Sequence, residues 1–186
     1  TEDRLIGVRD PMGVRPLILG HLDGAPILTS ETCALDIIGA EFVREVDPGE
    51  IVVCTPDGIE SLSPFPPAKS RPCIFEYVYF SRPDSIAQGR SIYAVRKAIG
   101  AILARESAVE VDVVIPVPDS GPPAAIGYSE EAGAPFELGI IRNHYVGRTF
   151  IEPSQNIRNF GVKLKHNANR AEIEGRRVVL VDDSIV

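Results

Sequence analysis

Two adjacent carboxylates and a serine follow an apolar run near the end of the sequence. The run 178–181 reads Val-Val-Leu-Val, and Asp182, Asp183 and Ser184 come directly after it. Such a run is typical of a buried strand, and ligands of open α/β sheets bind beyond the carboxyl ends of their strands. Neighbouring carboxylates repel each other, and sugar hydroxyls or a hydrated Mg²⁺ would offset that repulsion. The pattern therefore predicts a sugar or magnesium site, although an acidic helix cap, a Walker-B-like strand and a response-regulator pocket share it.

A second candidate site follows the apolar run 111–115. Asp119, Ser120 and Gly121 separate this run from a helix that we expect from about Pro123 to Glu131. The free N–H groups at the start of a helix bind anions, and the Asp119 and Ser120 side chains have the oxygen atoms to help hold a metal. A strand–helix turn with proline at the first helical position is the purely structural alternative.

Residues 142–170 form a basic segment in a chain whose formal net charge is −7. This segment holds six Lys or Arg residues against a single acid, Glu152, and has no clean periodicity. A long basic loop of this kind is typical of a lid that closes over a polyphosphate. A solvated or subunit-facing surface is one alternative, and RNA binding with Tyr145 and Phe150 stacked on bases is another.

The elements that would position these residues fall into two halves. The first predicts antiparallel β structure, with strands at 5–8, 16–19, 27–28, 50–54 and 58–61 and a helix at 32–38 that Ser30 caps and Gly39 ends. Residues 62–72, which hold four prolines, predict a linker. The second half predicts a parallel α/β sheet, with strands at 74–80, 111–115, 137–141 and 178–181, a helix capped by Ser91 and a helix at 123–131.

Composition narrows the class of protein. Of the 186 residues, 44% are hydrophobic and 24% are charged, which is typical of a globular domain rather than a disordered chain. The negative net charge argues against nucleic-acid binding, and no apolar stretch approaches the length of a membrane span. The three cysteines, Cys33, Cys54 and Cys73, are too widely spaced for a CxxC site and fit a cytosolic protein with reduced thiols.

Six segments occur in an order and spacing that resemble the amidophosphoribosyltransferase family. They read RDPMGVRPLILG, TSETCALDIIG, EYVYFSRPDS, ESAVEVDVVIPVPDSG, RNHYVGRTFI and VVLVDDSIV, and the resemblance covers essentially the whole chain. It implies that residues 1–68 are the C-terminal part of an N-terminal-nucleophile (class II) glutaminase domain, an α+β fold with antiparallel sheets. Residues 69–186 would then be a type I phosphoribosyltransferase domain with a parallel sheet, truncated at its C-terminus.

The resemblance also implies a reaction. In this family an N-terminal cysteine hydrolyses glutamine, and the ammonia passes through a channel to the second site. There it displaces pyrophosphate from phosphoribosyl pyrophosphate and gives 5-phosphoribosylamine, the first committed step of purine synthesis. We expect this chain by itself to have neither activity, because the nucleophile and part of the 5′-phosphate site lie outside it. Purine nucleotides as feedback inhibitors, a homodimer or homotetramer, and a cytoplasmic location are also implied.

Residue roles carried over from the family complete the expectation. Asp182 and Asp183 correspond to the acidic pair that serves ribose hydroxyls and Mg²⁺, and Ser120 to the Mg²⁺-associated hydroxyl of the pyrophosphate loop. Residues 142–158 resemble the flexible loop that closes on the substrate. The substrate-binding residues expected from the resemblance are Asp119, Ser120, Tyr145, Gly147, Arg148, Thr149, Asp182, Asp183 and Ser184.

Cys73 corresponds to a ligand of a [4Fe–4S] cluster in one branch of the family and to a plain cysteine in the other. Thiolate ligation suits such a cluster, and a packed core thiol is the alternative. We assign Cys33 and Cys54 to core packing. Two other functions remain alternatives for the whole chain, a non-catalytic sensor of phosphoribosyl pyrophosphate and a nucleobase phosphoribosyltransferase.

Overall fold

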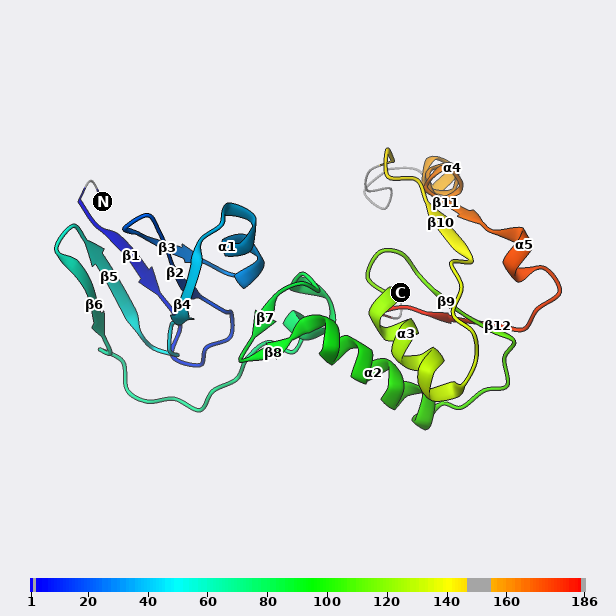
Figure 1. Cartoon of the computed structure of the whole chain (residues 1–186), viewed down its shortest axis with the longest axis horizontal. Helices are drawn as coiled ribbons and strands as arrows, with labels where there is room; N and C mark the ends of the chain where they lie inside the picture. The colour runs from blue at the N-terminus through cyan, green and yellow to red at the C-terminus, as the bar shows by residue number, and fades with distance from the viewer. Residues whose placement is uncertain (2, 147–154, 185–186) are drawn as a thin grey trace. The chain divides into compact units, whose positions relative to one another are not determined.

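The computed structural model describes residues 1, 3–146 and 155–184, with the side chains of residues 155–159 excepted. The chain divides into two compact units, Thr1–Tyr93 and Ala94–Val186. Antiparallel strands dominate the first unit, whereas the second combines helices with a parallel strand pair (Figure 1). The architecture is therefore mixed α/β, as the sequence predicted.

Two three-stranded antiparallel sheets form most of the first unit. One has the order β1 (Leu5–Val8), β5 (Ile51–Thr55), β6 (Gly58–Leu62), and the other has the order β3 (Ala25–Thr29), β2 (Ile18–Leu22), β4 (Glu41–Glu45). Helix α1 (Thr32–Ile38) connects β3 to β4. A core cluster of Leu19, Val46, Val52 and Cys54 packs between elements of the two sheets, which confirms the packing role predicted for Cys54.

The predicted helix at 32–38 is confirmed, including its end at Gly39, whose φ of 70° is left-handed. Its predicted cap is wrong. Glu31, not Ser30, occupies the N-cap position and makes no side-chain cap bond. The Glu31 carboxylate instead accepts hydrogen bonds from Arg82 N at 2.7 Å and Ser85 Oγ at 2.8 Å. A contact distant in sequence therefore replaces the local cap.

The aromatic run 74–80, predicted as a strand, is a π-helical turn η1 (Glu76–Phe80). Glu76 is buried in this turn, where Ser81 Oγ donates to its carboxylate at 2.8 Å and Arg15 Nη1 lies 3.0 Å from it. The Arg15 guanidinium also lies 4.8 Å from the centre of the Phe80 ring. These contacts outweigh the β propensity of the aromatic residues. A two-residue hairpin, β7 (Ile86–Ala87) and β8 (Arg90–Ser91), follows the turn.

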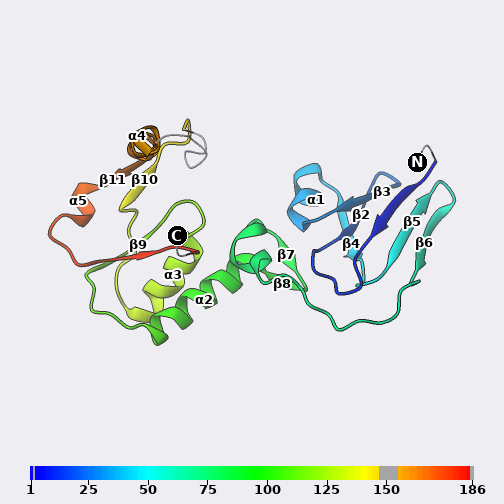
Figure 2. The ribbon, with the colours of Figure 1, turned by 180° about the vertical axis from the view of Figure 1, so that it is seen from behind.

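The second unit is built around strands β9 (Val113–Pro116) and β12 (Val178–Val181), which pair in parallel. Helix α3 (Pro122–Ala132) packs on this pair, and α2 (Ile92–Glu106) packs on α3 (Figure 2). The core cluster consists of Ala104, Val114, Ala125, Tyr128 and Val181. The predicted parallel sheet is thus confirmed for this pair, whereas β10 (Ile140–Arg142) pairs antiparallel with β11 (His166–Ala168).

Helix α4 (Gln155–Lys165) and strand β11 lie in the segment 142–170 that was predicted to be a long loop, and helix α5 (Arg170–Ile173) begins at its last residue. That prediction is wrong from Gln155 onwards. The apolar side chains of α4 that the structure describes, Phe160, Val162 and Leu164, are all exposed. The sequence spacing of Ile157, Phe160 and Leu164 is nonetheless helical, so the prediction of a loop overlooked a period that the sequence holds.

Helices α2 and α3 approach so closely that two glycines are required between them. A Cβ atom on Gly100 would lie 1.8 Å from the Ala124 carbonyl oxygen, and one on Gly127 would lie 1.8 Å from that of Lys97. Both obstacles are backbone atoms, which cannot move aside as a flexible side chain can. The crossing of the two helices therefore depends on these two positions.

We predict that Gly100→Ala lowers the free energy of unfolding by about 1–3 kcal/mol, because the helices must separate to admit the methyl group. Chemical denaturation monitored by circular dichroism measures this loss. Ala98→Ser, at an exposed position of the same helix, is the matched control and should change stability by at most about 0.5 kcal/mol. Equal stability of the Gly100→Ala variant and the wild type would contradict the close crossing.

A buried carboxylate organises the corner of the first unit. Glu50, whose side chain is 5% exposed, receives Arg44 Nη1 at 2.8 Å and Arg44 Nη2 at 2.6 Å. The backbone N–H of Asp47 donates to the same carboxylate at 2.7 Å. These hydrogen bonds, with that of Arg44 the strongest, lower the pKa of Glu50 to about 2 although burial alone would raise it.

The lowered pKa of Glu50 predicts an acid-sensitive first unit. Because the folded pKa of about 2 lies below the ordinary value of 4.5, the stabilisation is complete above pH 4.5 and is lost as the pH falls towards 2. Glu50→Gln should destabilise the unit at pH 7 by about 1.5–3 kcal/mol and remove this acid dependence. Urea unfolding at several pH values measures both effects, and a variant that keeps the wild-type acid dependence would refute the assignment.

Candidate functional site

Two of the sequence-predicted segments meet at the carboxyl ends of β9 and β12. The parallel register pairs Val113 with Val178 and Pro116 with Val181, so both strands end at the same edge (Figure 1). The connection continues beyond the strands, because Val117 N donates to Val181 O at 2.9 Å. The loop 117–121 and the acidic segment 182–184 therefore lie side by side.

Gly121 lets the loop lie close to both strands. A Cβ atom at this position would lie 2.6 Å from the carbonyl oxygens of Val117 and Val181. Its N–H donates to Val117 O at 2.9 Å, and Pro122 and Pro123 at the start of α3 carry no N–H group. The helix start therefore offers fewer free donors to an anion than an ordinary helix would, and side chains must supply more of the binding.

The acidic pair is partly organised by itself. Asp183 N donates to Asp182 Oδ1 at 2.8 Å, and Ser184 Oγ donates to Asp183 Oδ1 at 2.8 Å. The other carboxylate oxygen of the second acid, Asp183 Oδ2, is buried without a hydrogen-bond partner among the described residues. Buried carboxylate oxygens are rarely left unpaired, and a cation would satisfy this one.

The donor set at this edge fits magnesium. Mg²⁺ prefers oxygen ligands, keeps several waters and is usually held by one or two carboxylates together with substrate phosphates. Asp182, Asp183 and the Ser120 hydroxyl have the appropriate chemistry. In the described part of the chain no three His, Cys, Asp or Glu side chains are grouped so as to enclose a metal ion by themselves.

An ion pair brings a third element to the site. Arg142, the last residue of β10, pairs through Nη1 with Asp119 Oδ2 in the loop after β9. Arg142 Nε and His166 Nε2 are buried without hydrogen-bond partners among the described residues, and these two residues face each other in the β10–β11 register. Burial, followed by the charges of Lys165 and Arg142, lowers the pKa of His166.

Neither Arg142 nor His166 was predicted from the sequence to be a site residue. Arg142 was recognised only as one of the cations of the basic segment, and His166 carried no signal at all. Arg142 reaches the site through its ion pair with Asp119, and the antiparallel pairing of β10 with β11 places residue 166 opposite residue 142. Such a pairing across 24 positions leaves no trace in local periodicity.

The remaining predicted residues lie after β10. The Tyr145 side chain is fully exposed, and its backbone N–H donates to Asn143 Oδ1 at 3.0 Å. Gly147, Arg148 and Thr149 lie outside the residues that the structure describes. Their part in a site stays a prediction.

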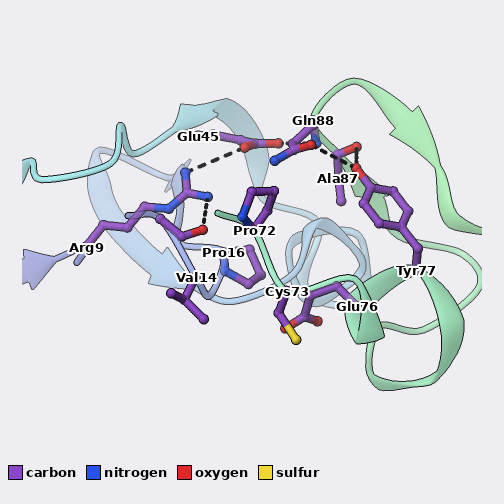
Figure 3. Close-up of a pocket in the computed structure, with 11 residues that line it drawn as sticks. Arg9, Val14, Pro16, Glu45, Pro72, Cys73, Glu76, Tyr77, Ala87 and Gln88 are labelled. Carbon is purple, nitrogen blue, oxygen red and sulfur yellow. Dashed lines mark hydrogen bonds and ion pairs between the residues drawn. The ribbon is translucent and has the colours of Figure 1, made fainter. Parts of the chain in front are cut away.

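Cys73 borders a separate small pocket in the first unit. Figure 3 shows the Arg9 guanidinium on one side of this pocket and the Tyr77 ring on the other. Arg9 Nη1 lies 3.7 Å from Glu45 Oε2, and Tyr77 donates to Ala87 O at 3.1 Å. The free space is about 20 Å³, which is close to the room that one water needs. The pocket therefore cannot hold a substrate.

The cysteines allow at most one cluster ligand from the described residues. Cys33 and Cys54 are buried in α1 and β5, whereas Cys73 is only partly buried. Burial raises the pKa of both buried thiols, which disfavours the thiolate that a metal requires. Cys73 fits a cluster only if further ligands come from other residues of a longer protein.

Comparisons with known proteins agree on one family. The chain is 64% identical to the amidophosphoribosyltransferase of Rhizobium etli over its whole length, which is 38% of that protein. It is 59% identical to the chloroplastic amidophosphoribosyltransferase of Glycine max, of which it covers 33%. No family model matches the chain.

Solved structures give the same result. All of the chain superimposes on 41% of the B. subtilis glutamine phosphoribosylpyrophosphate amidotransferase complexed with ADP and GMP, with a TM-score of 0.91 and 51% identity. The chain therefore spans only about a third to two-fifths of the length of the proteins it matches.

The unpaired Asp183 oxygen predicts stabilisation by magnesium. At ten times the dissociation constant, magnesium should stabilise the folded protein by about 1.4 kcal/mol, which raises its melting temperature by a few degrees. Asp183→Asn should remove most of this rise. Differential scanning calorimetry with and without MgCl₂ measures it, and Asp112→Asn, at the opposite ends of the same strands, should retain it. If magnesium still raises the melting temperature of the Asp183→Asn variant, the cation binds elsewhere.

Proposed function

Because the chain is homologous over its whole length to the amidophosphoribosyltransferases, we propose that it is the central part of such an enzyme. The complete protein would convert phosphoribosyl pyrophosphate and glutamine to 5-phosphoribosylamine, pyrophosphate and glutamate, the first step of purine biosynthesis. The observation that carries the proposal is the meeting of loop 117–121 with the acidic segment 182–184 at one edge of a parallel strand pair.

In the transfer step ammonia forms a bond to C1 of the ribose while the bond from C1 to the pyrophosphate oxygen breaks. The ammonia nitrogen then loses a proton, and the pyrophosphate leaves with the electron pair of the broken bond. Positive charge develops on the sugar, so the tasks of the protein are to position the reactants, to offset charge and to exclude water. Asp182 and Asp183 would bind the ribose hydroxyls, and Ser120 would lie against the pyrophosphate.

Magnesium would supply charge neutralisation for the pyrophosphate, held by Ser120, Asp182 and Asp183. The exposed Tyr145 would contact the substrate together with Gly147, Arg148 and Thr149. Ser184 positions Asp183 through its 2.8 Å hydrogen bond, and Asp119 belongs to the loop that surrounds the pyrophosphate. The Arg142 pair described above brings a cation to the same loop.

The domain assignment is part of the proposal. Residues 1–68 would be the C-terminal part of the glutaminase domain, and residues 69–186 would belong to the phosphoribosyltransferase domain. The antiparallel sheets of the first half and the parallel pair of the second support this division. In a complete protein, Cys73 would be one ligand of a [4Fe–4S] cluster, with a structural role because the transfer reaction moves no electrons.

The name of one solved relative bears on the regulation of the complete protein. The B. subtilis structure contains ADP and GMP, which supports purine nucleotides as feedback inhibitors of the complete protein. No helix in the described part of the chain has the length and apolar character to cross a membrane. We propose a cytoplasmic homo-oligomer that does not bind nucleic acid.

The two alternative functions fit the whole chain less well. A sensor of phosphoribosyl pyrophosphate and a nucleobase phosphoribosyltransferase would both use the edge of β9 and β12. Neither needs the antiparallel first unit, whose sequence aligns with the amidotransferases along with the rest of the chain. This first unit is the feature that favours the amidotransferase.

The proposal predicts that the acidic pair matters for only one of the two half-reactions. In the complete enzyme, Asp182→Asn and Asp183→Asn should each lower phosphoribosylamine formation by about 10²–10³-fold, because an electrostatic contact to the transition state is lost. Glutamine hydrolysis should fall far less. Parallel assays of glutamate release and phosphoribosylamine formation measure the two rates.

Glu110→Gln is the matched control, since Glu110 pairs with Arg177 at the opposite ends of the strands. Its two rates should both stay close to wild type. An equal loss of both activities in the Asp182 and Asp183 variants would show that the pair has a structural role only.

A further inference from the structure

We propose that Asp119 is an internal competitor of the substrate. Its carboxylate holds the Arg142 guanidinium in the ligand-free protein, and Arg142 passes to the pyrophosphate group when the substrate binds. The inference rests on the proposed function and gives Asp119 a role different from that of a direct ligand contact. It predicts that removing this carboxylate tightens binding, whereas removing a ligand contact would weaken it.

The pair joins two elements that belong to different sheets. Asp119 lies in the loop after β9, which pairs with β12, whereas Arg142 ends β10, which pairs with β11. The Asp119 side chain is 54% exposed and the Arg142 side chain 27%. A ligand that enters loop 117–121 can therefore reach the carboxylate without unfolding either element.

The pair leaves the Arg142 guanidinium incompletely satisfied. Arg142 Nε is buried without a hydrogen-bond partner among the described residues, and so is Nε2 of His166, its partner in the strand register. A guanidinium has five N–H donors in a planar fork that matches the oxygens of a phosphate. A pyrophosphate group, with more acceptor oxygens than one carboxylate, can occupy donors that Asp119 leaves free.

The charge of the site is a second reason to expect that Asp119 binds Arg142 rather than the ligand. Asp119, Asp182 and Asp183 place three carboxylates around a site proposed for a polyanion, and a metal held by the acidic pair offsets only part of that charge. An acid that touches the ligand directly would add repulsion. Asp119 instead pairs with Arg142 beside loop 117–121. While the site is empty, this pair prevents the Arg142 guanidinium from being buried without a counter-charge.

The cost of this arrangement is a weaker apparent affinity. When Arg142 is available only in a fraction of the molecules, the apparent dissociation constant rises by the inverse of that fraction. Asp119→Asn keeps the size of the side chain but removes the charge that holds Arg142. In the complete protein, this variant should bind inorganic pyrophosphate about three- to tenfold more tightly in the presence of magnesium.

A double-mutant cycle separates competition for Arg142 from simple charge repulsion. Arg142→Gln should weaken pyrophosphate binding by about tenfold or more, because the cation that is transferred to the ligand is gone. Adding Asp119→Asn to the Arg142→Gln variant should then not increase the affinity for pyrophosphate. Simple repulsion would give the same gain in both backgrounds. Isothermal titration calorimetry of the four proteins with magnesium pyrophosphate measures the cycle, and the equally uncharged Arg142→Met replaces Arg142→Gln if the latter does not fold.

The proposal stands if Asp119→Asn increases the affinity for pyrophosphate only when a cation is present at position 142. Weaker binding by Asp119→Asn, or an equal gain in both backgrounds, overturns it and leaves the proposed function intact. A wild-type protein that binds neither pyrophosphate nor phosphoribosyl pyrophosphate would instead overturn the proposed function itself.

Discussion

The parallel pairing of β9 with β12 is the interaction on which the candidate site depends. It joins segments more than 60 residues apart, and its register places Pro116 opposite Val181, so that the loop and the acidic pair start at the same level. The side chains of Asp119, Ser120, Asp182 and Asp183 are all positioned from that edge. The bidentate contact of Arg177 with Asp112 secures the opposite ends of the two strands, with Nη2 to Oδ1 at 2.7 Å. Backbone hydrogen bonds along the strand pair and the Arg177–Asp112 contact at its far end thus hold the edge in place.

A different kind of contact holds the first unit together. The structure assigns residues up to Tyr93 to the antiparallel half, well beyond the proline-rich linker. Side chains of α1 account for this, because Glu31 binds Arg82 N and Ser85 Oγ, and Thr32 Oγ1 accepts a bond from Ile86 N at 2.8 Å. Ser85 O in turn accepts the N–H of Ile92 at the start of α2. The N-cap residue of α1 is therefore linked through Ser85 to the first residue of α2.

Contacts of this kind also explain which elements of the fold could be predicted from the sequence and which could not. Strand β12 was predicted with its observed bounds because a buried strand in a parallel pair needs an apolar run, and the run is visible. The turn at 76–80 was missed because its conformation depends on Arg15 and Ser81, which bind the buried Glu76. Strand β4 was missed because Phe42 and Val43 are both exposed, so the alternation of a half-buried strand is absent.

Some residues of the candidate site could likewise be predicted from the sequence, and others could not. Asp182, Asp183, Asp119 and Ser120 were recognisable because each follows an apolar run, and ligand sites of α/β sheets lie where such runs end. The contribution of Arg142 was not recognisable, since its meeting with Asp119 joins two elements that pair in different sheets. The unpaired buried atoms of Arg142, His166 and Asp183 are likewise properties of the fold, which composition and spacing do not encode.

The two prolines at the start of α3 carry a consequence for how the site distinguishes its ligands. A helix start with free N–H groups attracts any small anion through fixed dipoles. Pro122 and Pro123 remove two of those donors, and Gly121 N–H is already used within the loop. Solitary phosphate or sulfate then finds little fixed attraction there. A ligand that brings its own magnesium and its own ribose hydroxyls gains contacts that simple inorganic anions lack. The loop 117–121 thereby distinguishes between ligands through the N–H donors that it lacks.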